Sequence, residues 1–141
     1  ENIGKRQVKA PKVYFRDSGL LHNLLSLPQE SALMGHPNVG ASWEGFALEQ
    51  VLISLRQPEA YFWAAYSGGE VDLIFEKDGK RYGVEFKYSE SPRIPASIQS
   101  HIAKLALEQL WVVCPGRDSF DVYDNVSVTS ITGFIREAEL S

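Results

Sequence analysis

The chain has 141 residues, of which 44% are hydrophobic and 11% aromatic; this fits one globular domain with a hydrophobic core and argues against a disordered chain. Its formal net charge of −4 argues against nucleic-acid binding through a broad basic surface, so any such binding must be local. The single cysteine, Cys114, excludes an internal disulfide and a multi-cysteine zinc site. Because no apolar run approaches the roughly 20 residues of a membrane span, we expect a cytoplasmic protein.

The N-terminal part predicts a connection followed by a helix. Residues 1–11 carry three basic side chains without apolar periodicity, which indicates a linker or the tail of a preceding module, and a single domain is expected over residues 12–141. Asp17 lies where the N-cap of a helix belongs. One apolar stripe follows it, formed by Leu20, Leu21, Leu24 and Leu25.

A second helix is expected over about residues 41–55. In a helical projection Glu44 falls within the apolar arc, near Leu48 and Val51, whereas Ser42 and Glu49 fall on the polar arc. Burying an unpaired carboxylate is costly, so Glu44 should be protonated, ion-paired or bound to a metal ion.

The stretch of residues 67–91 predicts a β-hairpin, because its apolar residues alternate with period two. The first strand places Val71, Leu73 and Phe75 on one face, and the second does the same with Tyr82, Val84, Phe86 and Tyr88. Between the strands lies the dipeptide 78–79, Asp-Gly, which favours a two-residue turn. In that register paired residue numbers sum to 157, so Asp72 faces Glu85, and Lys87 emerges on the same face as Glu85.

The other segments complete a mixed α/β pattern. Residues 61–63 indicate a strand antiparallel to the hairpin, with residues 67–69 as the turn, and residues 96–107 indicate a crossover helix. The apolar run 110–114 is typical of a strand buried on both faces. Short strands near residues 122 and 126–128 and a helix from Thr132 follow, with no pattern that suggests chemistry. We therefore expect a mixed central sheet flanked by helices.

The polar face of the hairpin carries the strongest chemical signal. Two acidic side chains opposed on one face need a cation between them, and hard oxygen ligands beside an ammonium group suit Mg²⁺ and phosphodiester hydrolysis by a metal-activated water. Asp72, Glu85 and Lys87 form this set.

A purely structural interpretation is also open. In it Glu70 pairs with Lys87, Asp72 is exposed, and Glu85 is held by Arg81 or Lys80. Exposed ion pairs contribute only about 0–1 kcal/mol, so stability alone does not require them. The cations of the hairpin, with Arg93 beyond it, are interpreted equally well as a phosphate-facing patch or as solvated side chains.

The sequence Asp72, a hairpin, then Glu85-Phe86-Lys87 resembles the D…(D/E)-x-K core of the PD-(D/E)XK nuclease superfamily. More narrowly, the runs 12–15, 17–20, 43–46, 67–72 and 84–87 resemble a prokaryotic family of uncharacterised domains that follow an AAA-type ATPase module. The resemblance covers residues 12 to about 116. Val71 departs from it, because the superfamily has proline there.

This resemblance implies a restriction-endonuclease-like core in a fragment of a longer ATPase protein. It implies Asp72, Glu85 and Glu44 as ligands of Mg²⁺ or Mn²⁺, with Glu44 acting directly or through water and Lys87 orienting the attacking water or stabilising charge on the phosphate. The expected partner is nucleic acid, with DNA first, and ATP would bind only to the upstream module, since this chain has no Walker-type loop.

Two other functions remain open on the sequence. The acidic balance favours a catalytically inactive module that binds DNA or protein for the ATPase, so enzymatic activity is not decided. The second open function is that of a toxin-like or defence nuclease. The sequence leaves undecided DNA against RNA, the substrate preference, the oligomeric state and the pathway.

Overall fold

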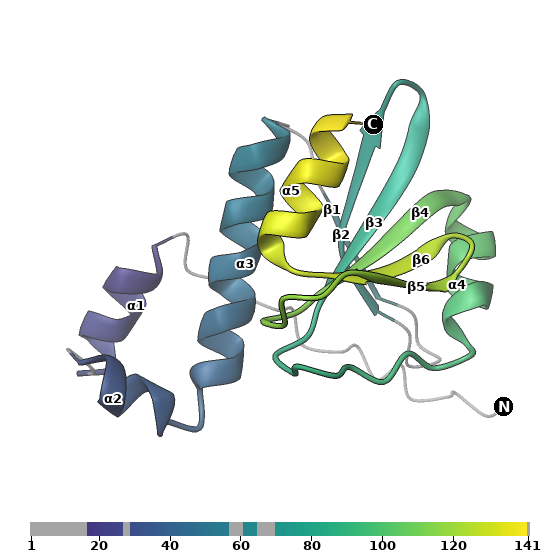
Figure 1. The fold of residues 1–141 in the computed structure, drawn as a ribbon. Coiled ribbons are helices and arrows are strands. Elements are labelled where there is room, and N and C mark those ends of the chain that lie inside the picture. The colour runs from purple at the N-terminus through teal and green to yellow at the C-terminus, as the bar shows by residue number, and fades with distance from the viewer. Residues whose placement is uncertain (1–16, 27–28, 57–60, 65–69, 141) are drawn as a thin grey trace, which may run out of the picture.

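The computed structural model describes residues 17–26, 29–56, 61–64 and 70–140 (Figure 1). The expectations for residues 1–16 and for the turn at 67–69 lie outside these ranges. The helices are α1 (Ser18–Leu24), α2 (Glu30–Met34), α3 (Val39–Leu55), α4 (Ile98–Leu105) and α5 (Ile131–Leu140). The strands are β1 (Tyr61–Ala64), β2 (Glu70–Lys77), β3 (Lys80–Phe86), β4 (Leu107–Val113), β5 (Phe120–Tyr123) and β6 (Val126–Thr129).

The strands form one mixed sheet in the order β1-β2-β3-β4-β6-β5. The pairs β1–β2, β2–β3 and β5–β6 are antiparallel, whereas β3–β4 and β4–β6 are parallel. Helix α4 makes the crossover between β3 and β4, as the helical spacing of residues 96–107 predicts. The prediction of a mixed α/β fold is confirmed.

Helices cover both faces of the sheet (Figure 1). One face packs on α4 through an apolar group that we call the α4-side cluster, which includes Ile74, Ile98 and Leu110. The other face packs on α3 and α5 through the α3/α5-side cluster. In this second cluster the rings of Tyr82 and Trp111 stack at 5.7 Å between centroids. Within the described residues no helix is both long and apolar enough to cross a membrane.

The central hairpin has the predicted turn and register. Asp78 and Gly79 have φ values of +52° and +74°, the backbone that a two-residue hairpin turn requires. Leu73 pairs with Val84, and the pairing continues to Lys77 opposite Lys80.

The start of β2 departs from the prediction. Tyr61 pairs with Ile74 and Trp63 with Val71, so the one residue of β1 between these pairs lies opposite two residues of β2. This β-bulge breaks the alternation of faces, because one extra residue is inserted in β2. Val71 therefore belongs to the α4-side cluster, whereas Leu73 and Phe75 belong to the α3/α5-side cluster. The prediction that these three share one face is wrong.

The N-terminal helices agree with the sequence prediction only in part. The Asp17 side chain caps α1 as predicted, accepting a hydrogen bond from the Leu20 backbone N–H at 3.0 Å. Ser42, predicted on the polar arc of α3, is buried, and its hydroxyl lies 2.5 Å from Nε2 of His22 in α1. The polar arc is thus partly covered, because α3 packs on α1 as well as on the sheet.

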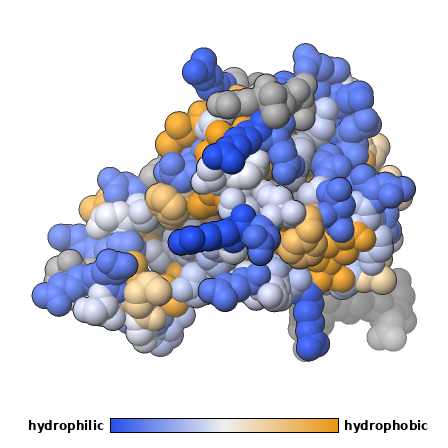
Figure 2. Space-filling view, in the orientation of Figure 1, coloured by the Kyte–Doolittle hydropathy of each residue, from blue (hydrophilic) through white to orange (hydrophobic). Residues whose placement is uncertain are grey.

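Apolar side chains interrupt the hydrophilic surface in several separate areas (Figure 2). Two members of the leucine stripe, Leu20 and Leu24, are 52% and 62% exposed, so α1 does not bury that stripe. The other large apolar side chains that are exposed are Met34, Phe46, Ile53, Tyr88, Phe120 and Tyr123.

Candidate functional site

The three parallel strands end at one edge of the sheet. The backbone N–H of Lys87, just after β3, donates to the Val113 carbonyl oxygen at 3.0 Å, and the N–H of Cys114, just after β4, donates to the Thr129 carbonyl oxygen at 2.9 Å. The residues that follow β3, β4 and β6 therefore lie next to one another. In open α/β sheets, ligands bind outside these carboxyl ends.

Asp72 is brought to this edge from β2. It is 5% exposed, and its Oδ2 accepts a hydrogen bond from the backbone N–H of Phe86 at 2.9 Å. The carboxylate thus satisfies a buried backbone donor just beyond the pair Leu73 and Val84, where the register between β2 and β3 begins. This bond holds the carboxylate beside the peptide that joins Glu85 to Phe86.

Glu85 and Lys87 form an ion pair, with 2.6 Å between Oε1 and Nζ. The Glu85 side chain is 12% exposed and that of Lys87 is 46% exposed, so the carboxylate is largely covered while the ammonium group reaches solvent. Because Val84 and Phe86 belong to the α3/α5-side cluster, alternation places Glu85 on the opposite face. The structure therefore brings the predicted residues Asp72, Glu85 and Lys87 to one end of the hairpin.

Glu44 comes from α3, whose apolar side packs on the other face of the sheet, and its side chain is half-buried. Among the described residues no group of three or more His, Cys, Asp or Glu side chains lies close enough to hold a metal ion. Glu44 thus does not join Asp72 and Glu85 in such a group, and its part in metal binding stays a prediction. A group of three is not a general requirement, because proteins commonly bind Mg²⁺ with one or two carboxylates plus waters and substrate phosphates.

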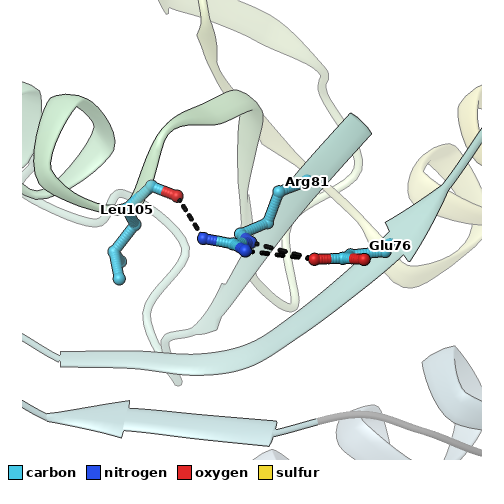
Figure 3. Close-up of polar contacts among 3 residues, drawn as sticks. All are labelled: Glu76, Arg81 and Leu105. Atoms are coloured by element: carbon cyan, nitrogen blue, oxygen red, sulfur yellow. Dashed lines mark hydrogen bonds and ion pairs between the residues drawn. The ribbon is translucent and has the colours of Figure 1, made fainter. Parts of the chain in front are cut away.

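Arg81 is committed elsewhere. Its guanidinium donates to the Glu76 carboxylate, with 3.1 Å between Nη2 and Oε1, and its Nη1 donates to the Leu105 carbonyl oxygen at 3.0 Å (Figure 3). This contact lies toward the turn of the hairpin, away from the carboxyl end of β3. The interpretation in which Arg81 holds Glu85 is therefore wrong.

Lys80 is also engaged, through an ion pair with Glu108 at 2.7 Å between Nζ and Oε1. The hydrogen bond to Glu108, followed by its negative charge, raises the pKa of Lys80. Lys80 does not hold Glu85 either, and Asp72 is buried rather than exposed. The purely structural interpretation fails on these points.

A cavity of about 500 Å³ opens at the same edge of the sheet. Its walls are Trp43 of α3, residues 114–117 after β4, Ser119, residues 130–133 at the start of α5, and Arg136. The sequence of the C-terminal segment showed no pattern that suggests chemistry, so the cavity was not predicted. These residues come from segments far apart in the sequence, and no local pattern marks them as neighbours.

Comparisons with known proteins identify the family but not the activity. Residues 39–134 match a family described as a domain of unknown function, DUF4143, and the chain belongs to that family. Uncharacterised proteins of Mycobacterium bovis and Mycobacterium tuberculosis are each 44% identical to this chain over 125 residues, which is 89% of the chain. The chain spans 28% of the length of each of these relatives. No solved structure matches it.

Proposed function

We propose that this DUF4143 domain has a restriction-endonuclease-like core and hydrolyses phosphodiester bonds of nucleic acid, DNA first, with the help of Mg²⁺ or Mn²⁺. We further propose that it belongs to a longer cytoplasmic protein with an AAA-type ATPase module. The mycobacterial relatives support only the greater length, since the matched region is 28% of each.

One observation carries the proposal for hydrolysis. The buried carboxylate of Asp72 is fixed by the N–H of Phe86, the residue that follows Glu85, and the Glu85 carboxylate in turn is fixed by Lys87. Two ordered carboxylates and an ammonium group at the carboxyl end of a strand offer hard oxygen donors next to a positive charge. A bound Mg²⁺ would lower the pKa of a water ligand and neutralise charge on the phosphate.

The residues of the chain have separate parts in this arrangement. The hydrogen bond from Phe86 fixes the orientation of the Asp72 carboxylate before any ligand arrives, which is the preorganisation that a catalytic site needs. Lys87, with about half of its side chain exposed, presents its ammonium group to solvent, where it can meet a phosphate oxygen. Glu44 would act as a further ligand, directly or through water.

The same hairpin supplies a matched control for a test. Glu76 and Arg81 also form a carboxylate–cation pair on β2 and β3, but toward the turn (Figure 3). We would incubate the chain with end-labelled single- and double-stranded DNA and with RNA, in Mg²⁺, in Mn²⁺ and in EDTA. Cleavage should require the metal ion and should fall by at least about 100-fold in Glu85→Gln and Lys87→Ala, whereas Glu76→Gln should cleave as the wild type does.

A binding module without catalysis is the second candidate function. It is favoured by the ion pair itself, because Glu85 and Lys87 already satisfy each other without a metal ion. If the folded chain binds nucleic acid but cleaves none of these substrates in either metal, the hydrolytic proposal is refuted. Equal cleavage by Glu85→Gln and the wild type would refute the assignment of the site.

A further inference from the structure

The cavity beside the candidate site has the size of a small-molecule pocket. Its volume of about 500 Å³ lies within the range of roughly 300–1,000 Å³ that is usual for ligand sites. It lies between the loop after β4 and the first turn of α5, and Trp43 of α3 forms a further wall. The site described above does not use it.

The charge of this cavity is opposite to that of the chain. Arg117 and Arg136 line it, and no Asp or Glu is among its lining residues, although the chain as a whole carries −4. Both arginines are exposed, and among the described residues neither forms an ion pair with a carboxylate. Two guanidinium groups facing one concave space, with no anion from the described protein between them, fit a phosphate group, which arginine can bind through two parallel hydrogen bonds.

The polar groups under the arginines are tightly packed. The hydroxyl groups of Ser119 and Thr129 lie 2.7 Å apart, and the Ser130 hydroxyl accepts the N–H of Gly133 at 3.0 Å. A Cβ at Gly133 would come within 2.2 Å of Thr129 Oγ1, so only glycine allows these hydroxyl groups to approach α5. Because these three hydroxyl groups satisfy one another and the helix end, the two arginines are the charged lining groups available to recognise an anion.

The cavity also adjoins the segment that directly follows the carboxylate site in the chain. The Trp43 ring, half-buried, lies 5.9 Å from the ring of Tyr88, which follows Lys87 in the chain. A Cβ at Gly116, another lining residue, would lie 3.4 Å from the carbonyl oxygen of Glu90. The segment after β3 therefore connects the two sites, and it offers aromatic surface on which a base can stack.

We propose that this cavity binds a phosphate group of a single-stranded nucleic-acid chain, with Arg117 and Arg136 as the phosphate ligands and Trp43 as the stacking surface. The inference extends the proposed function, because it names where a nucleic-acid strand is held beside the carboxylates. It does not require cleavage, so the two can fail separately.

The test is a binding measurement without metal. Fluorescence anisotropy of a labelled ten-nucleotide oligothymidylate would be followed in EDTA with the whole chain, with Arg117→Gln/Arg136→Gln and with the control Arg56→Gln/Lys104→Gln. These two control cations are also exposed and do not line the cavity. Circular dichroism and urea unfolding would show that each variant is folded. Inorganic phosphate would serve as a competitor, and an oligouridylate would compare RNA with DNA.

The pocket variant should bind at least about ten-fold more weakly than the wild type, a loss of about 1.4 kcal/mol, because it removes the charge-assisted hydrogen bonds of both guanidinium groups. Its salt dependence should flatten, with the slope of log K against log salt smaller by about 1.4, since about 0.7 of a counterion is released per contact on a single strand. The control should bind as the wild type does, and Trp43→Phe should weaken binding less than loss of the arginines does.

Several results would overturn the inference. One is equal affinity of the wild type and the pocket variant, and another is an equal loss in the control. Competition by phosphate that is the same in wild type and pocket variant would show that the phosphate binds elsewhere. If the wild type cleaves DNA and the pocket variant binds it with unchanged affinity, the proposed hydrolysis stands and the proposed phosphate-binding cavity is refuted. If binding depends on the arginines and no substrate is cleaved, the cavity stands and the proposed hydrolysis is refuted.

Discussion

Substitutions of Asp72 can separate its structural role, as a hydrogen-bond acceptor, from its proposed chemical role as a metal ligand. Its carboxylate accepts the buried N–H of Phe86 at 2.9 Å, so Asp72→Ala leaves that donor unsatisfied. Such a loss costs about 1–3 kcal/mol, and a domain of this size loses about 3–4 °C of Tm per kcal/mol, so we expect a fall of roughly 3–12 °C. Asp72→Asn keeps an oxygen acceptor of the same size, and its loss should be less than half of that.

The charge, in contrast, is lost in both variants. Calorimetric titration of Mg²⁺ and Mn²⁺ into each folded protein should therefore show saturable binding in the wild type and none in Asp72→Asn or Asp72→Ala, while urea unfolding gives the stability of each. Metal binding retained by Asp72→Asn would refute the role of Asp72 as a ligand. An Asp72→Ala protein as stable as the wild type would refute the stabilising role of its hydrogen bond.

Two further predictions concern the same strands. In Gly83→Ala the new Cβ would lie 2.8 Å from Cδ1 of both Leu107 and Leu110, so urea unfolding should show a loss of about 1–3 kcal/mol; an unchanged midpoint would contradict the tight packing of β3 against β4. Glu108 raises the pKa of Lys80 above its ordinary value of 10.5, so any stability from this pair is complete below that pH and is lost as the pH rises through the raised value. The free energy of unfolding of Lys80→Met should thus differ from that of the wild type by a small, constant amount between neutral pH and the ordinary lysine pKa. If unfolding measured as a function of pH shows a difference that grows across this range, the prediction is wrong.

Local signals in the sequence were sufficient for the hairpin. The Asp-Gly pair fixes the turn because its backbone needs positive φ at both positions, and the turn then fixes which residues pair, down to Leu73 opposite Val84. Asp72, Glu85 and Lys87 could be selected together for the same reason, since they lie on two strands joined by that turn.

Features that depend on distant segments could not be predicted in this way. The bulge in β2 exists only in relation to β1, and it moves Val71 to the α4 side of the sheet without any local mark in the sequence. Ser42 is buried because α1 packs on α3, although its position in the helical projection favours solvent. The arginine-lined cavity is a third case, because the parallel order of β3, β4 and β6 assembles it from separate segments.

The two sites at this edge place opposite demands on a nucleic-acid strand. In these proposals the Asp72 and Glu85 carboxylates, even with Glu85 paired to Lys87, would repel a phosphate unless a divalent cation lay between them and it, whereas Arg117 and Arg136 would attract one without help. A strand held first in the arginine-lined cavity would bring its next phosphate toward the carboxylates, where a divalent cation becomes necessary. If both proposals hold, an acidic chain would bind nucleic acid locally, and the metal requirement would belong to the carboxylate site rather than to binding as a whole.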